Sequence, residues 1–301
     1  MADAEIDTPW VDRFWPAPGA GGLALHARDY AAAAGPARAP AVCLHGLTRN
    51  ARDFETLAPH LAASGRRVLA VDVRGRGRSA WDPDPSRYTH ATYAVDVLAL
   101  LDALAIARAV FIGTSMGGLI TMVAGAMRPS AVAAAVINDV GPELAPEGLA
   151  RITGFAGKGE PVQTWADAVA YAERVNKLAF PHYGLAQWQA FARRLFVEKD
   201  GKPVLDYDPA IAKAFAPPPP PEGEAPPPAP DLWPLFKGLA GRPLLTVRGG
   251  ISDLLSPGIL SRMREAVPDM AVAEVPGVGH APMLDEPEAL TAIDALLEKA
   301  P

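Results

Sequence analysis

Short, mainly apolar runs that each end at a turn signal alternate with longer helical patterns along most of this chain. The apolar runs lie at 41–44, 67–71, 109–112, 132–137, 244–247 and 270–275. Uninterrupted runs of this length are typical of strands that are buried on both faces of a sheet. Helical patterns follow or separate them at 52–63, 89–105, 115–127, 255–266 and 286–299. This order predicts an α/β fold with a mostly parallel, doubly wound sheet between two layers of helices.

A different pattern occupies residues 142–242. This segment has helical stretches near 162–179 and 184–199 but no convincing buried strand, and a proline-rich run spans 217–230. We predict that it forms a helical cap over the sheet edge where the parallel strands end, because ligand sites of such sheets gather there. The proline-rich run is expected to be an extended linker or a disordered loop, with an SH3-type ligand as a minor alternative.

The remaining parts of the chain, 1–141 and 243–301, are predicted to form one core. Within it, residues 22–30 alternate between apolar and polar side chains, which indicates an antiparallel strand near the N-terminus. Half of the 301 residues are hydrophobic (50%). The chain therefore has ample material for a packed interior, and a wholly disordered chain is excluded.

Charge and cysteine content exclude several functional classes. The net charge is −6, from 28 Lys and Arg against 34 Asp and Glu, whereas nucleic-acid binding usually needs a basic face. The single cysteine, Cys43, excludes an intramolecular disulfide framework and cannot by itself build a Cys-rich zinc site. The N-terminus lacks the regions of a secretory signal, and no apolar stretch reaches the roughly 18 residues of a membrane span. We therefore expect a cytoplasmic protein that binds neither nucleic acid nor a membrane.

The most informative motif is the hexapeptide 113–118, which reads GTSMGG and lies between a predicted strand and a helical pattern. A sharp strand-to-helix turn needs small residues at Gly113 and Gly117, because a side chain there would collide with the neighbouring backbone. Such a turn raises the Ser115 hydroxyl at the sheet edge. It also directs the Met116 N–H, at a helix N-terminus, toward any oxyanion that forms there. The motif predicts that Ser115 is a nucleophile.

A serine nucleophile needs a general base, and the base needs an acid that orients it. His280 and Asp253 follow the last two predicted strands, so both are expected at the same sheet edge as Ser115. The chain order Ser, Asp, His favours Asp253 as the acid. Asp139, which follows another predicted strand, is the alternative acid, whereas we interpret Asp72 as the start of a structural loop.

The loop at 45–48, which reads HGLT, is predicted to supply the second backbone donor for the oxyanion. Gly46 permits a tight backbone there, and the N–H of Leu47 is the candidate donor. We interpret His45 as a residue that braces this loop through backbone hydrogen bonds, not as the base.

Together these motifs resemble those of the α/β-hydrolase fold superfamily, in its single-chain, capped form. The matching residues are His45-Gly46, the segment DVRGRGRS at 72–79, the hexapeptide 113–118, Asp253 and Gly279-His280. The likeness spans about 40–140 and 242–299, and the cap matches only in position and helical character. The resemblance implies Ser115 as nucleophile, His280 as base and Asp253 as acid, with Leu47 and Met116 as the oxyanion-hole donors.

The resemblance also implies a reaction class, namely hydrolysis of a small, largely apolar carboxylic ester or lactone without a cofactor. Ser115 differs from the Asp nucleophile of the dehalogenases and epoxide hydrolases of this fold. Carbon–carbon bond hydrolases typically have a longer loop with glycine and proline after His-Gly, where this chain has LTRN. Two alternatives stay open: a carbon–carbon bond hydrolase with the same triad, and a ligand-binding protein of this fold with low turnover.

Aromatic residues of the inserted segment predict a largely apolar substrate pocket. Phe155, Trp165 and Trp188 are the candidates for its wall. The expected partner is a small-molecule substrate. The histidines show no paired spacing, so no metal site is expected. The oligomeric state, monomer or homodimer, stays open.

Overall fold

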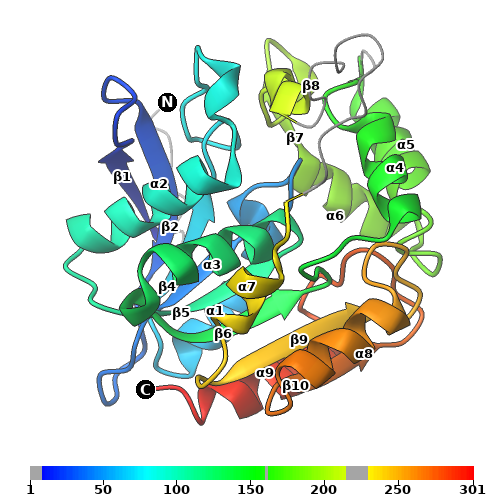
Figure 1. Ribbon diagram of the computed structural model, residues 1–301. Helices are drawn as coiled ribbons and strands as arrows, with labels where there is room; N and C mark the ends of the chain where they lie inside the picture. The colour runs from blue at the N-terminus through cyan, green and yellow to red at the C-terminus, as the bar shows by residue number, and fades with distance from the viewer. Residues whose placement is uncertain (1–8, 160–161, 215–229) are drawn as a thin grey trace, which may run out of the picture.

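The computed structural model describes residues 9–159, 162–214 and 230–301, and its centre is an eight-stranded sheet (Figure 1). The strand order is β1-β2-β4-β3-β5-β6-β9-β10. The strands are β1 (Val11–Pro16), β2 (Ala24–Tyr30), β3 (Ala41–Leu44), β4 (Val68–Asp72), β5 (Ala109–Thr114), β6 (Val132–Asn138), β9 (Leu244–Gly249) and β10 (Ala271–Val275). All neighbours from β4 to β10 in this order are parallel, and β2 is antiparallel to both β1 and β4. The predicted, mostly parallel sheet is therefore confirmed.

Strand β1 is the one element of this sheet that the sequence analysis did not predict. It pairs only with β2 at the sheet edge, and Trp15 is its one buried residue. An edge strand with a single buried side chain has no apolar run, so the pattern that identified the central strands is missing here.

The helices predicted for the core are all present. They are α1 (Leu57–Ala63), α2 (His90–Ala103), α3 (Met116–Met127), α8 (Pro257–Ala266) and α9 (Pro287–Leu297). A short helix, α7 (Trp233–Lys237), was not predicted. Helix α1 begins later than expected, because the 3-10 turn η1 (Ala51–Phe54) occupies its predicted start, where the Asn50 side chain accepts from the Arg52 N–H.

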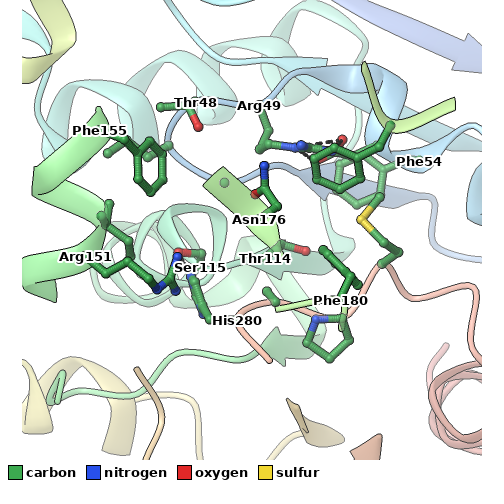
Figure 2. A pocket seen from close by; sticks show the side chains of 18 residues that line it. Thr48, Arg49, Phe54, Thr114, Ser115, Arg151, Phe155, Asn176, Phe180 and His280 are labelled. Carbon is green, nitrogen blue, oxygen red and sulfur yellow. Dashed lines mark hydrogen bonds and ion pairs between the residues drawn. The ribbon is translucent and has the colours of Figure 1, made fainter. Parts of the chain in front are cut away.

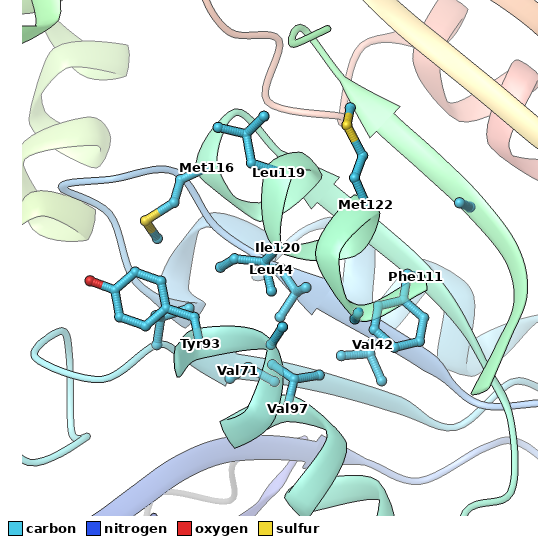
Figure 3. Close-up of a cluster of buried hydrophobic side chains, with 14 of the residues drawn as sticks. Val42, Leu44, Val71, Tyr93, Val97, Phe111, Met116, Leu119, Ile120 and Met122 are labelled. Carbon is cyan, nitrogen blue, oxygen red and sulfur yellow. The ribbon is translucent and has the colours of Figure 1, made fainter. Parts of the chain in front are cut away.

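Helices cover both faces of the sheet. Val42 and Leu44 of β3 pack into a buried cluster with side chains of α2 and α3, part of which Figure 3 shows. The alternate residues Ala41 and Cys43 lie in a second cluster on the opposite face, with side chains of α1 and α9. Because successive strand residues point to opposite faces, a continuous apolar run is what a doubly covered sheet requires.

The described residues between β6 and the proline-rich run hold three α-helices and a small hairpin, which Figure 1 shows gathered over one edge of the sheet. They are α4 (Pro146–Phe155), α5 (Trp165–Asn176), α6 (Leu185–Leu195), β7 (Phe196–Lys199) and β8 (Lys202–Leu205). The helical patterns near 162–179 and 184–199 correspond to α5 and α6, whereas α4 and the hairpin were not predicted. The boundaries of the predicted cap stay a prediction, and 217–229 of the proline-rich run lies outside the described residues.

Two further findings concern the described parts of the chain. None of the helices found there has both the length and the apolar character that crossing a membrane requires. The same residues contain no group of three or more His, Cys, Asp or Glu side chains placed to hold a metal ion.

Candidate active site

Ser115 lies in a sharp turn between β5 and α3, with a φ of 53° and a ψ of −114°. Residues other than glycine rarely adopt a positive φ, so the surrounding structure must hold the backbone in this conformation. The two glycines of the motif allow it. A Cβ atom at Gly117 would lie 2.0 Å from the Leu44 carbonyl oxygen, and one at Gly113 would lie 2.3 Å from the Gly117 carbonyl oxygen. The turn therefore depends on glycine at both positions.

The Ser115 hydroxyl lies 2.9 Å from Nε2 of His280, which the loop after β10 supplies. Nδ1 of the same ring lies 2.8 Å from Oδ2 of Asp139, directly after β6. Because a carboxylate accepts hydrogen bonds, Nδ1 carries the ring proton and Nε2 offers its lone pair to the serine. The arrangement gives Ser115 a base within reach of its proton, and gives that base a fixed tautomer.

Asp139 is fully buried and accepts two further hydrogen bonds. The Gly249 N–H donates to Oδ1 at 2.7 Å, and the Ser252 hydroxyl donates to Oδ2 at 2.7 Å. Its φ of 55° turns the residue out of the strand, while its N–H still bonds the Val247 carbonyl oxygen at 2.8 Å. These bonds hold the carboxylate in one orientation toward His280.

The choice of Asp253 as the acid is corrected by this geometry. The Asp253 carboxylate accepts from Nε and Nη2 of Arg151 on α4, at 2.6 and 2.9 Å, while His280 bonds Asp139. The hydrogen bond from Arg151 is also the main cause that lowers the pKa of Asp253, with a smaller contribution from the charge of His280. Asp253 is therefore close to the site, but it is turned toward the inserted segment.

The loop that contains Leu47 runs beside Ser115. A Cβ atom at Gly46 would lie 3.8 Å from Cβ of Ser115, so this backbone passes the hydroxyl closely. In the described part of the chain, no backbone hydrogen bond outside the helices and strands uses the N–H of Leu47 or of Met116. Met116 opens α3, where the first N–H groups have no partner within the helix. Both predicted donors thus flank the serine.

His45 braces this loop, as the sequence analysis interprets it. Its Nε2 accepts from the Val73 N–H at 3.0 Å, so Nδ1 carries the proton and donates to the Gly46 carbonyl oxygen at 2.7 Å. Burial lowers the pKa of His45 to about 4, which keeps the ring neutral near pH 7. Because the C=O and N–H of a trans peptide point in opposite directions, holding the Gly46 carbonyl also sets the direction of the Leu47 N–H.

Asn138 is a buried residue of the site that the sequence analysis did not single out. Its carbonyl oxygen accepts from the Ser115 N–H at 2.9 Å. Its Nδ2 donates to Oγ1 of Thr114 at 3.0 Å and to the Pro282 carbonyl oxygen at 2.8 Å. Asn138 therefore joins the ends of β5 and β6 to the loop that carries His280, and no local pattern signals such a contact.

A pocket with a cavity volume of about 90 Å³ opens beside Ser115 and His280. Figure 2 shows Phe155 and Arg151 of α4 among the side chains that line it, with Phe180 and Arg49 on other walls. The structure therefore places the predicted wall residue Phe155 in the pocket.

Trp165 and Trp188 are not among the residues that line this pocket, which corrects their assignment. Trp188 is buried in the interior of the inserted segment, where it packs edge-on against Phe191. Trp165 lies under the guanidinium of Arg193, 3.5 Å from its ring centroid, and its indole N–H donates to Glu198. Both residues therefore pack within the segment, Trp188 in its buried cluster and Trp165 against Arg193.

This fold and this site place the chain in a known class of proteins. The model of the alpha/beta hydrolase family matches residues 41–293, and the chain belongs to this family. A solved structure of an alpha/beta hydrolase from Novosphingobium aromaticivorans is 44% identical, covers 97% of this chain and 99% of its own, and superposes with a TM-score of 0.88.

Two curated relatives are named for hydrolase activities. A 3-hydroxybutyrate-oligomer hydrolase of Cupriavidus necator is 36% identical over 253 residues, which are 82% of this chain and 84% of the relative. A 2-(acetamidomethylene)succinate hydrolase of Mesorhizobium japonicum is 30% identical over 236 residues, which are 78% of this chain and 79% of the relative. The family and these relatives support hydrolase activity.

Proposed function

We propose that this protein is a serine hydrolase that cleaves carboxylic esters through an acyl-enzyme on Ser115. The observation that carries the proposal is the pair of hydrogen bonds that joins Ser115 to His280 and His280 to Asp139. This arrangement raises the nucleophilicity of a serine by removing its proton as it attacks.

In the proposed mechanism, Nε2 of His280 takes the proton of Ser115 while Oγ attacks the ester carbonyl carbon. The N–H groups of Leu47 and Met116 stabilise the oxyanion of the tetrahedral intermediate. His280 then gives its proton to the leaving alcohol, and the acyl group stays on Ser115. Water repeats the attack with His280 as base, and the acid is released. Asp139 stabilises the positive charge of His280 in both steps.

The pocket supports a small substrate with apolar groups next to the ester. Phe155, Phe180 and Phe191 line it together with polar groups near Ser115. The relative named for 3-hydroxybutyrate oligomers supports an ester, because such oligomers are joined by ester bonds. We therefore propose short esters of hydroxy acids as the first substrates to examine.

The same geometry favours turnover over ligand binding alone. A binding protein has no need for a histidine that contacts both a strained serine and a buried carboxylate, whereas acyl transfer requires this arrangement.

Carbon–carbon bond cleavage on the same residues would release a different pair of products from a vinylogous diketone, so product analysis separates it from ester hydrolysis.

The experiment that tests the proposal combines covalent labelling with product analysis. A fluorophosphonate probe should add one mass increment to the wild-type protein and none to the Ser115→Ala variant. The wild type should also release two molecules of 3-hydroxybutyrate from each molecule of its linear dimer. Absence of both labelling and product on folded protein would refute the proposed function.

A further inference from the structure

Arg151 is a cation of helix α4 that lines the same pocket as Ser115 and His280 (Figure 2). A guanidinium in the same pocket wall as the reacting serine has a chemical consequence, because it attracts an anionic group of the ligand. The way in which this guanidinium is held determines which of its donors a ligand can use.

The backbone of α4 is packed tightly against the loop that contains Asp253. The Gly148 N–H donates to the Asp253 carbonyl oxygen at 3.1 Å, and a Cβ atom at Gly148 would lie 2.6 Å from the same oxygen. Arg151 follows three residues later, on the same face of the helix. The close approach at Gly148 therefore brings the Arg151 side chain onto the Asp253 carboxylate and limits its motion.

Asp253 occupies only one edge of the guanidinium. Its two oxygens accept from Nε and Nη2, at 2.6 and 2.9 Å, which is the side-on arrangement of an arginine and a carboxylate. A guanidinium has five N–H groups, so the end-on edge formed by Nη1 and the second proton of Nη2 remains. In the described residues no acceptor is recorded for Nη1, and 18% of the side chain is exposed. This free edge can bind a second carboxylate with two hydrogen bonds.

Arg49 is the other cation of the pocket wall, but its position is less open. It bonds Asp53 through Nε and Nη2, and its guanidinium lies 4.1 Å from the centroid of the Phe191 ring. Its Nη1 is shielded from solvent and has no hydrogen-bond partner among the described residues. The unused donor of Arg49 is therefore covered by the protein, and its side chain is less exposed than that of Arg151, at 12% against 18%.

We propose that Arg151 binds a free carboxylate of the substrate through its Nη1 and Nη2 edge, while Asp253 holds the guanidinium in position. The preferred substrates are then esters that carry a carboxylate close to the scissile bond, a class that includes short linear oligomers of hydroxy acids. This inference rests on the proposed ester hydrolysis and names its substrate class. Arg151 acts as a specificity residue, and Asp253 as the residue that positions it.

The first test compares two substrates that differ only in this charge. The linear dimer of 3-hydroxybutyrate is supplied as the free acid and as its methyl ester, and kcat/KM for the central ester bond is measured near pH 7.5. A charge-assisted, two-bond contact should favour the free acid by about 10- to 100-fold, mainly through KM. Equal values, or a preference for the methyl ester, would overturn the inference.

The second test changes the residue. Arg151→Gln should lower kcat/KM for the free acid much more than for the methyl ester, so that the ratio of the two falls to about one. Arg151→Lys keeps the charge without the two-pronged edge and should give an intermediate ratio. Arg128→Gln is the matched control, because Arg128 forms an exposed ion pair with Asp102 away from the pocket and should leave the ratio unchanged. Equal loss on both substrates in Arg151→Gln would show a merely structural role.

Failure of this inference is distinguishable from failure of the proposed function. If the wild type cleaves both dimers equally, ester hydrolysis stands and the role of Arg151 is refuted. If it cleaves neither, ester hydrolysis is refuted, and calorimetric titration of the Ser115→Ala protein with both dimers still measures the contact. If the free acid binds more tightly than the methyl ester, and this preference is lost in a Ser115→Ala, Arg151→Gln double variant, the proposed contact of Arg151 is supported. Equal binding of the two dimers refutes it.

Discussion

The carboxylate of Asp139 lies 2.8 Å from Nδ1 of His280, at a point where three loops of the sheet edge converge. Asp139 directly follows strand β6, the donor Gly249 ends strand β9 with Ser252 just after it, and the loop after β10 carries His280. Three donors thus fix one carboxylate, and through it the orientation of the histidine ring toward Ser115. From these and neighbouring contacts we predict effects of single substitutions on activity or stability.

Ser115→Ala removes the nucleophile while leaving the turn and the pocket in place. We expect kcat for a p-nitrophenyl ester to fall by a factor on the order of 10⁴ or more, because no hydroxyl remains for His280 to activate. Steady-state kinetics on purified protein measures the loss. Ser130→Ala, at an exposed position in the η3 turn (Pro129–Ala131), is the control and should match the wild type. A variant at position 115 with near wild-type kcat would rule out this nucleophile.

The roles of the two carboxylates at the site can be distinguished by the variants Asp139→Asn and Asp253→Asn. Asp139→Asn should lower kcat by about 10³- to 10⁴-fold, because the amide no longer stabilises the protonated histidine or its tautomer. Asp253→Asn should cost less than about tenfold on a neutral ester, because its carboxylate contacts Arg151 and not His280. The measurement is kcat of both variants on the same ester. A larger loss in Asp253→Asn than in Asp139→Asn would show that Asp253 is the acid that orients His280.

Gly117→Ala tests the close approach beneath the serine turn. A Cβ atom at this position would lie 2.0 Å from the Leu44 carbonyl oxygen, so β3 or α3 must move. We expect a loss of roughly 3 kcal/mol or more in the free energy of unfolding, measured by chemical denaturation. Gly154→Ala in α4 is the matched control. No atom lies within 4 Å of the new Cβ, so the helix should gain about 0.5–1 kcal/mol.

His45→Gln tests the loop brace through the pH dependence of stability. Burial lowers the pKa of His45 from 6.5 to about 4, so between these values the unfolded chain binds a proton that the folded chain does not. Stability from this group is therefore complete above pH 6.5 and is lost as the pH falls toward 4, by on the order of 3 kcal/mol.

The variant should be less stable than the wild type at pH 7.5, because it loses the contacts of the ring, yet it should lose less on acidification. His90 titrates in the same range, since burial lowers its pKa to about 4 as well. The measurement is therefore the difference between the unfolding free energies of the two proteins at pH 7.5, 6, 5 and 4.5. A difference that does not narrow with falling pH would contradict a neutral, buried His45.

Much of the fold could be read from local patterns. The central strands are apolar on both sides because helices cover both faces, and this produced the uninterrupted runs at β3, β5 and β9. Edge strand β1 was not predicted, because Trp15 is its one buried residue and the strand has no apolar run. In the inserted segment, the first helix, α4, and the hairpin were missed, and two tryptophans were placed in the pocket although they pack within the segment.

The sequence alone predicted Ser115 as nucleophile and His280 as base, since each lies in a local motif whose glycines and preceding strand indicate its position, and the structure brings the two side chains into contact. It favoured Asp253 over Asp139 as the acid, although both follow neighbouring parallel strands and therefore reach the same sheet edge. Contacts between distant parts of the chain make the distinction. Ser252 and Gly249 hold Asp139 toward the histidine, while Arg151, about a hundred residues before Asp253 in the sequence, neutralises the other carboxylate. Side-chain pairing across such separations follows from how α4 packs on the sheet, which no local spacing encodes.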